Sequence, residues 1–128
     1  MKFNTRKCYI VSLCKSSHLH SRDNQILKLV PLIPYLGVQL SENLSWSEHV
    51  STITKKVNSS LGLLRRSLRS CPEECRKTAY LALVRSVLEY SAVVWDPHQQ
   101  RDTEKLEDVQ RCAARFIKQD YRSRQVAL

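Results

Sequence analysis

Apolar residues recur at helical spacing in three segments between residues 45 and 120, and this periodicity predicts three helices. The first segment opens on Ser45–Glu48, a capping box in which the serine accepts an orphan backbone N–H and the glutamate reaches back. It continues to about Ser70, because Pro72 cannot extend a helix. Its expected buried face consists of Val50, Ile53, Val57, Leu61, Leu64 and Leu68.

The second helix is expected from about Glu73 to Ala92, with Pro72 at its start. Apolar residues cover two of its sides, one with Ala79, Leu83, Val87 and Tyr90 and the other with Leu81, Val84 and Leu88. This pattern predicts a central helix packed between neighbours. Asp102 or Thr103 is expected to cap the third helix. Its predicted buried face consists of Leu106, Val109, Ala113, Phe116 and Ile117, and an exposed ion pair is expected between Glu107 and Arg111.

The N-terminal third contains short runs rich in β-formers, which predict strands at Lys7–Leu13, Gln25–Val30 and Tyr35–Leu40. Pro31 and Pro34 are expected to bracket a break, and Gly37 to mark a bend. With 2 Gly and 4 Pro, tight hairpins should be rare. The predicted fold class is therefore α+β: a small antiparallel β-element (residues 1–44), a three-helix bundle (45–120) and a frayed tail (121–128).

The charge is uneven along the chain. Residues 1–70 hold 11 Lys and Arg against 3 acidic residues, whereas the remainder is nearly balanced, and the whole carries +9. On a helical wheel the first helix opposes its apolar face with a basic strip, defined by Lys55, Lys56, Ser59, Gly62, Arg65, Arg66 and Arg69. Such a strip either positions a nucleic-acid backbone or is an ordinary solvated face. We favour the first, because an interior helical glycine costs about 1 kcal/mol.

Other chemistries have little support in the sequence. Cys71 and Cys75 stand four residues apart, and His18 and His20 are close neighbours, but a structural zinc site wants two closely spaced ligand pairs at a usual separation. Two-metal phosphoryl transfer needs paired carboxylates, and the chain has no Asp-Asp pair. We therefore expect no catalytic residue, no metal ligand and no cofactor. No apolar run approaches a membrane span and no signal peptide is evident, which favours an intracellular protein with reduced cysteines.

An ordered series of short motifs resembles the reverse transcriptases of non-LTR, jockey-like retrotransposons. It starts at Asn4–Cys8 and Tyr35–Val38, similar to the family's Asn-x-x-Lys and Tyr-Leu-Gly-Val. Leu44–Val50 follows, similar to Leu-x-Trp-x-x-His-Ile, then Lys55-Lys56 and Leu61–Arg66. Further on come Leu83–Ser91 with Val94–Pro97, and Leu106–Arg111 with Ala113–Phe116. The resemblance covers residues 4–122. Ser86 departs from it, because the family usually has proline there.

The resemblance implies a place near the C-terminal end of a right-hand polymerase. The strands would end the palm, Tyr35, Leu36 and Gly37 would belong to a strand that grips the primer, and the helices would form the thumb along a template–primer duplex of RNA or DNA. The complete family enzyme is an RNA-directed DNA polymerase that uses Mg²⁺. Its catalytic aspartates would lie upstream, so this chain alone is expected to be inactive. The alternative is a stand-alone basic module that binds nucleic acid or another protein, with self-association through the incomplete sheet.

Overall fold

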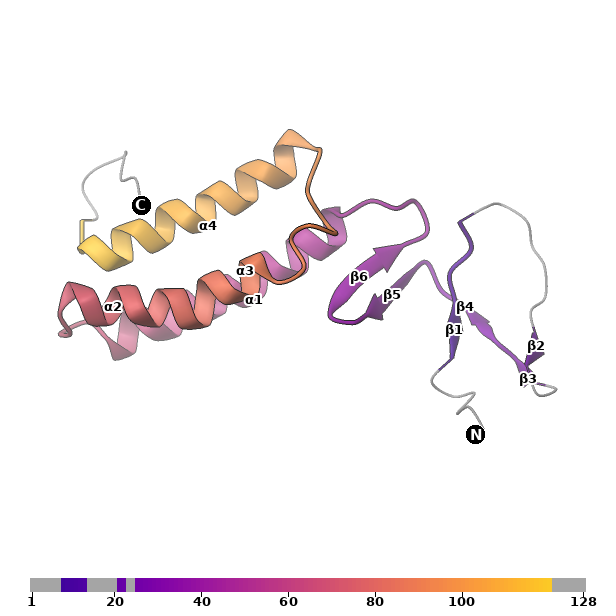
Figure 1. The fold of residues 1–128 in the computed structure, drawn as a ribbon, viewed down its shortest axis with the longest axis horizontal. Helices are drawn as coiled ribbons and strands as arrows, with labels where there is room; N and C mark the ends of the chain where they lie inside the picture. The colour runs from indigo at the N-terminus through magenta and orange to yellow at the C-terminus, as the bar shows by residue number, and fades with distance from the viewer. Residues whose placement is uncertain (1–7, 14–20, 23–24, 121–128) are drawn as a thin grey trace. The chain divides into compact units, whose positions relative to one another are not determined.

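The computed structural model describes residues 8–13, 21–22 and 25–120 (Figure 1). The chain divides into two compact units, Met1–Glu48 and His49–Leu128. Within the described ranges, short strands make up the first unit and helices the second, so the fold is mixed α+β. The tail at 121–128, His18, His20 and most of the Asn4–Cys8 motif lie outside the described residues.

Three strand pairs occur in the described part of the first unit. β2 (Ser21–Arg22) pairs with β3 (Gln25–Ile26) and β5 (Leu32–Tyr35) pairs with β6 (Val38–Ser41), both antiparallel. β1 (Tyr9–Ile10), however, runs parallel to β4 (Lys28–Leu29). This pair departs from the antiparallel arrangement expected from the sequence. A parallel pair needs a long connection, and the residues between β1 and β4 supply one.

The hairpin of β5 and β6 corrects the sequence prediction for this region. Leu36 and Gly37 have φ values of 48° and 84°, so they form a two-residue turn with two left-handed residues, as in type I′. The interpretation of Tyr35–Leu40 as one strand is therefore wrong, because the chain reverses at Leu36. Pro34 lies within β5, opposite Gln39, and is no break. Proline is tolerated there because β5 has only one neighbour among the described strands.

Helix α1 (Ser47–Ser67) begins close to the predicted position (Figure 1). The Ser45 hydroxyl accepts a hydrogen bond from the Ser47 amide at 3.4 Å, so this serine does serve a donor at the helix start. The predicted apolar face is confirmed for Val50, Ile53, Val57, Leu61 and Leu64, all buried, and Leu68 is half-buried beyond the helix end. His49 and Thr54 are buried with them, and the Thr54 hydroxyl donates to the Val50 carbonyl at 2.8 Å.

The predicted second helix is composed of α2 (Glu73–Tyr80), the π-helical segment η2 (Leu81–Arg85) and α3 (Ser86–Glu89). Its buried residues are Arg76, Tyr80, Val84 and Leu88, on one side only. Leu81 and Leu83 are 42% and 53% exposed, so the prediction of a helix covered on two sides is wrong. The helix also ends at Glu89 rather than Ala92, because Tyr90 adopts an extended backbone.

Helix α4 (Gln100–Lys118) buries Val109, Ala113, Phe116 and Ile117 as predicted, with Leu106 half-buried and Ala114 added. The exposed Glu107–Arg111 ion pair is also present, at 3.6 Å. The predicted cap is wrong: α4 begins before Asp102, and the Gln99 carbonyl accepts the Asp102 amide at 3.0 Å.

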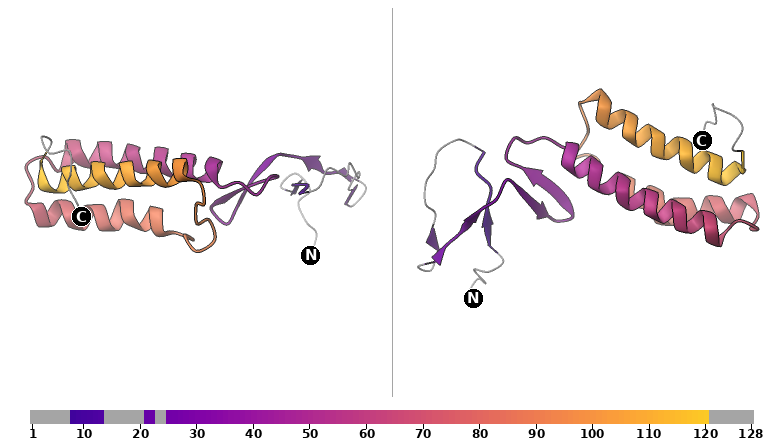
Figure 2. Two further views of the ribbon diagram at one scale, coloured as in Figure 1. Left: turned by 90° about the horizontal axis from the view of Figure 1, so that it is seen from above. Right: turned by 180° about the vertical axis from the view of Figure 1, so that it is seen from behind.

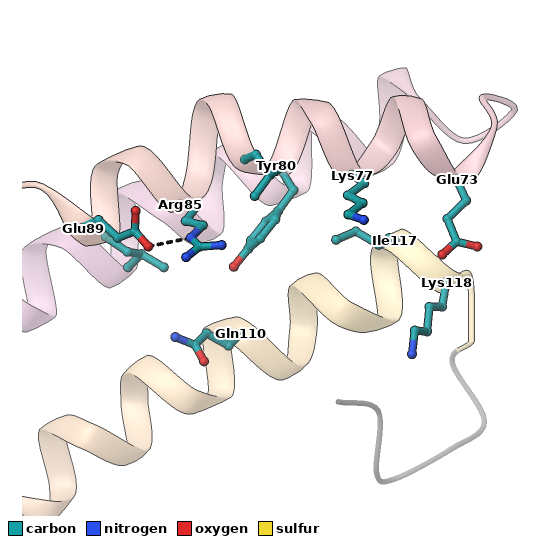
Figure 3. A pocket seen from close by; sticks show the side chains of 10 residues that line it. Glu73, Lys77, Tyr80, Arg85, Glu89, Gln110, Ile117 and Lys118 are labelled. Atoms are coloured by element: carbon teal, nitrogen blue, oxygen red, sulfur yellow. Dashed lines mark hydrogen bonds and ion pairs between the residues drawn. The ribbon is translucent and has the colours of Figure 1, made fainter. Parts of the chain in front are cut away.

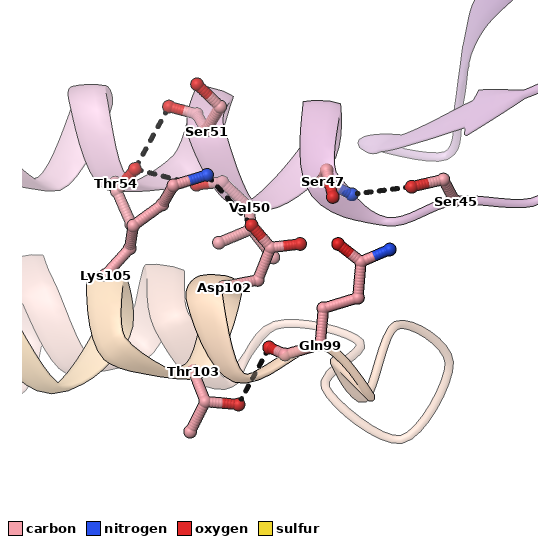
Figure 4. Close-up of polar contacts among 9 residues, drawn as sticks. All are labelled: Ser45, Ser47, Val50, Ser51, Thr54, Gln99, Asp102, Thr103 and Lys105. Atoms are coloured by element: carbon pink, nitrogen blue, oxygen red, sulfur yellow. Dashed lines mark hydrogen bonds and ion pairs between the residues drawn. The ribbon is translucent and has the colours of Figure 1, made fainter.

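The Asp102 side chain projects from the first turn of α4 toward α1 (Figure 4). It is 2% exposed and accepts a hydrogen bond from Lys105 Nζ at 2.8 Å. A carboxylate is favoured there, because the first turn of a helix carries a partial positive charge.

The three helical rods pack along one another in the second unit, as the two views in Figure 2 show. Side chain–backbone hydrogen bonds tie their ends together: Arg65 Nη2 donates to the Cys112 carbonyl at 3.2 Å, and Gln119 Nε2 to the Arg69 carbonyl at 2.6 Å. In the described ranges, no helix has both the length and the apolar character that a bilayer crossing demands.

Candidate nucleic-acid interface

The basic strip of α1 lies opposite the helix face that packs against the rest of the bundle. Five of its members are exposed, namely Lys55, Lys56, Ser59, Arg66 and Arg69, and Gly62 is half-buried. The apolar spacing fixes this arrangement, because burying residues such as Val57 and Leu61 on one side turns residues half a turn away toward solvent. The helix thus holds three exposed cations along one face, and Arg69 follows them in the turn just beyond the helix end.

These four cations lack acidic partners within the described part of the chain. The ion pairs there involve Arg85, Lys105 and Arg111, on other helices. A cation without a neighbouring carboxylate keeps its full field in the solvent beside it, and such a field attracts polyanions. The strip is therefore electrostatically available to an external anion.

Arg65 differs from the rest of the predicted strip. It is half-buried and turns toward α4, where its Nη2 donates to the Cys112 carbonyl. Its Nε is buried and has no acceptor among the described residues. Arg65 therefore links two helices rather than standing on the exposed face.

Gly62 is not required by packing. A Cβ added there would meet only Arg66 Nη1, at 3.7 Å, which is an ordinary contact distance. The space above Gly62 is thus open apart from the end of a flexible side chain. A glycine at this point leaves the α1 backbone accessible from the strip side.

The residues expected to resemble a primer grip occupy the β5–β6 hairpin, in the first unit. Tyr35 ends β5, and Leu36 and Gly37 form the turn. Leu36 is 74% exposed and Tyr35 is also exposed. The turn therefore presents an aromatic and an aliphatic side chain to solvent.

A second concave surface lies between α4 and the α2–η2–α3 rod (Figure 3). It encloses about 440 Å³, and Tyr80 and Arg85 project into it toward α4. Burial raises the pKa of the Tyr80 phenol, Arg85 lowers it, and Glu89 raises it again. Glu73 and Glu89 stand among its cations, and Arg85 is paired with Glu89 at 2.5 Å. Its charges are nearly balanced, so it offers little attraction to a polyanion.

The cysteine pair considered for zinc is in contact. The pKa of the Cys71 thiol is raised, first by desolvation and then by its hydrogen bond to Cys75. His18 and His20 lie outside the described residues. Among the residues that are described, no three His, Cys, Asp or Glu side chains converge on a metal-ion site, and neither zinc nor Mg²⁺ has a ligand set there.

Sequence reasoning missed Arg76, an arginine on α2 that is only 6% exposed. Its Nε donates to the Ile117 carbonyl at 2.8 Å, and its Nη1 donates to the Cys71 carbonyl. An arginine is almost never fully buried without partners, so its residue type predicted exposure. The one signal in the sequence is its spacing of four from Tyr80, in line with Val84 and Leu88.

No family model matches the chain, and neither curated proteins nor solved structures show a significant match to it. The resemblance to reverse transcriptases therefore rests on the ordered motifs in the sequence.

Proposed function

We propose that this chain is the nucleic-acid-gripping, C-terminal part of a non-LTR retrotransposon reverse transcriptase. In this proposal the three helices act as a thumb, and α1 lies along a template–primer duplex of RNA or DNA. The observation that carries the proposal is an exposed face formed by Lys55, Lys56 and Arg66 on α1 and by Arg69 just beyond its end. These four cations form no ion pair with any described residue. The motif series over residues 4–122 supports the same reading.

The contact has a simple physical basis. Lysine and arginine side chains neutralise phosphates and release the counterions condensed on the duplex, which favours binding without reading the sequence. Small residues at Ser59 and Gly62 let a backbone approach the helix between the cations. The Tyr35–Gly37 turn is the proposed grip on the primer end, where an exposed aromatic side chain can stack on a base.

Nucleotide addition is no part of the proposed role of this chain. The catalytic aspartates of the family belong to an upstream segment, and the role here is to hold the substrate. The same grip would serve a stand-alone module derived from a retroelement. An upstream reading frame encoding the Asp-Asp turn in the genome would favour the fragment, and an intact independent gene would favour the module.

The decisive variant changes Lys55, Arg66 and Arg69 to alanine. We expect affinity for an RNA–DNA hybrid duplex to fall about tenfold or more at moderate salt, because three phosphate contacts are lost. Helical circular dichroism and the unfolding midpoint should stay unchanged, since all three side chains are exposed. Fluorescence anisotropy of a labelled duplex measures the affinity.

A matched control removes the same charge elsewhere, by changing Lys77, Arg101 and Arg111 to alanine. These exposed cations lie on α2 and α4. The control should bind the duplex with nearly wild-type affinity. Equal losses in the two triple variants would show that net charge, and not the α1 strip, drives binding.

A further inference from the structure

A hollow opens where the end of α1, the start of α2 and the end of α4 meet. It encloses about 770 Å³ and is lined by Arg65, Arg66, Arg69, Ser70, Arg76, Phe116 and Gln119. Four of these are arginines: Arg65 and Arg66 belong to α1, Arg69 to the turn after it, and Arg76 to α2. None of the lining residues is acidic. The concave surface between α2 and α4 contrasts with it, because glutamates stand among the cations there.

Two of the arginines are held in place by neutral acceptors. Arg76 donates to the carbonyls of Ile117 and Cys71, and Arg65 donates to the carbonyl of Cys112. Carbonyl oxygens orient a guanidinium without cancelling its charge. Folding has therefore already ordered these two side chains. Anion binding would lose less side-chain entropy than it would with two mobile arginines.

Arg76 brings a buried positive charge to the wall of the hollow. This side chain is 6% exposed and forms no ion pair with any described residue. A buried charge is destabilising unless it is paired as well as hydrogen-bonded. An oxyanion in the hollow would supply the opposite charge.

The other two arginines, Arg66 and Arg69, are exposed at the rim. A guanidinium presents a planar fork of N–H donors that matches the oxygens of a phosphate, so both can close on an anion from solvent. The volume of the hollow, about 770 Å³, exceeds that of a single phosphate group. The hollow admits a phosphodiester together with its flanking sugars.

We infer that this hollow seats a backbone phosphate of the bound nucleic acid, with Arg66 and Arg69 as the donating forks and Arg65 and Arg76 as fixed cations. The inference rests on the proposed function and extends it. In this inference the contact surface continues beyond the α1 strip onto α2. The two ends of the strip then contact the nucleic acid in different ways. Lys55 and Lys56 meet the duplex on an open helix face, whereas the arginine end encloses a phosphate.

The test compares two double variants of the basic strip that lose equal charge, Arg66→Ala with Arg69→Ala, and Lys55→Ala with Lys56→Ala. Two probes are used: inorganic phosphate, followed by the Nε–Hε NMR signals of the arginines, and a labelled RNA–DNA hybrid duplex. We expect phosphate to shift the signals of the hollow arginines, Arg76 included, in the wild type and in the lysine variant. The arginine variant should lose these shifts, while duplex affinity falls about fivefold or more in both variants.

The two probes distinguish a phosphodiester of nucleic acid from free phosphate as the ligand of the hollow. A duplex that shifts the Arg76 signal at concentrations where free phosphate does not supports a backbone phosphodiester. Shifts with free phosphate alone would overturn the assignment to nucleic acid. Equal shifts at Arg101 and Arg111, outside the hollow, would mean a diffuse ion atmosphere and overturn the site.

Failure of the inference is distinguishable from failure of the proposed function. If the lysine variant loses duplex affinity and the arginine variant keeps it, the hollow is rejected, and the duplex contact is confined to the lysine end of the strip. If the wild type binds no duplex, the proposed function falls, and the phosphate titration still decides whether the hollow is an anion site. A conservative pair, Arg66→Lys with Arg69→Lys, keeps the charge and should recover only part of the affinity, because the planar forks are lost.

Discussion

His49 is the clearest case of a residue whose surroundings set its chemistry. It lies in the first turn of α1, is 2% exposed, and its ring meets that of Trp95 edge to face at a centroid distance of 5.1 Å. Trp95 is itself held by a hydrogen bond from its Nε1 to the Tyr90 carbonyl at 2.8 Å. Burial disfavours the charged imidazolium, so the pKa of His49 lies below its usual value of 6.5.

The lowered pKa predicts a loss of stability in mild acid. Below pH 6.5 the unfolded chain takes up a proton at this residue while the folded protein still resists it. The free energy of unfolding should therefore be insensitive to His49 above pH 6.5. It should fall as the pH drops toward the lowered folded pKa, by at most about 1.4 kcal/mol per pH unit. Urea denaturation between about pH 7.5 and pH 5.5 measures this fall.

His49→Gln should flatten the profile in that range, because it removes the buried group that takes up the proton. An unchanged profile in His49→Gln would assign the acid sensitivity to other groups. His49 packs inside the helical unit, as its burial shows. Its partner Trp95 lies in a turn beyond the next helix, and nothing in the local pattern pointed to it.

Among the helices, the segment Glu73–Glu89 departs most from its sequence pattern. Four residues cover about 400° in an α-helix, so side chains spaced by four drift by about 40° at each step. The wider turn of η2 compensates this drift and keeps Tyr80, Val84 and Leu88 on one side.

This register predicts opposite outcomes for two neighbouring residues. Val84→Asp should destabilise the helical unit by about 3 kcal/mol or more, because it buries an unpaired carboxylate at a fully buried position. Leu83→Asp should change the free energy of unfolding by less than about 0.5 kcal/mol, since Leu83 faces solvent. Chemical denaturation of both variants measures the difference. Severe destabilisation by Leu83→Asp, with Val84→Asp tolerated, would contradict this register and place the Leu83 side of the helix inside.

The β5–β6 hairpin is an element that the local sequence pattern did not predict. Two-residue turns of this type favour Asn-Gly, and a leucine with positive φ is unusual because its Cβ crowds the backbone. The Leu36-Gly37 pair thus lacks the usual turn signal at its first position. Because apolar residues flank the pair on both sides, the pattern predicted one continuous strand. The chain reversal at Leu36 and Gly37 was therefore not predicted.

For the molecule as a whole, the uneven charge has a measurable consequence. If the four exposed cations of the basic strip each neutralise one phosphate, the logarithm of the binding constant should fall with the logarithm of salt concentration. The slope should be about −3.6 or steeper. Changing Lys55, Arg66 and Arg69 to alanine should reduce the steepness by about 2.7. Anisotropy titrations at several salt concentrations give the slope.

Salt-independent binding, or a slope unaltered by the triple variant, would contradict an electrostatic grip through α1. A salt-insensitive self-association, measured by sedimentation in the same buffers, would favour the alternative of a protein-interaction module. The two measurements address different surfaces, because the strip is charged and the exposed residues of the β5–β6 turn are apolar.

The sequence by itself determined α1 and α4, the faces they bury and the exposed cations opposite the α1 core. Amphipathic periodicity is a local property of the sequence, so it indicates the buried face of a helix whichever elements pack against that face. Only the tertiary structure decided the burial of Arg76 and Asp102, the inward turn of Arg65 and the meeting of His49 with Trp95. Each of these depends on an acceptor, a helix end or a ring contributed by a distant segment, and no spacing along one element encodes it.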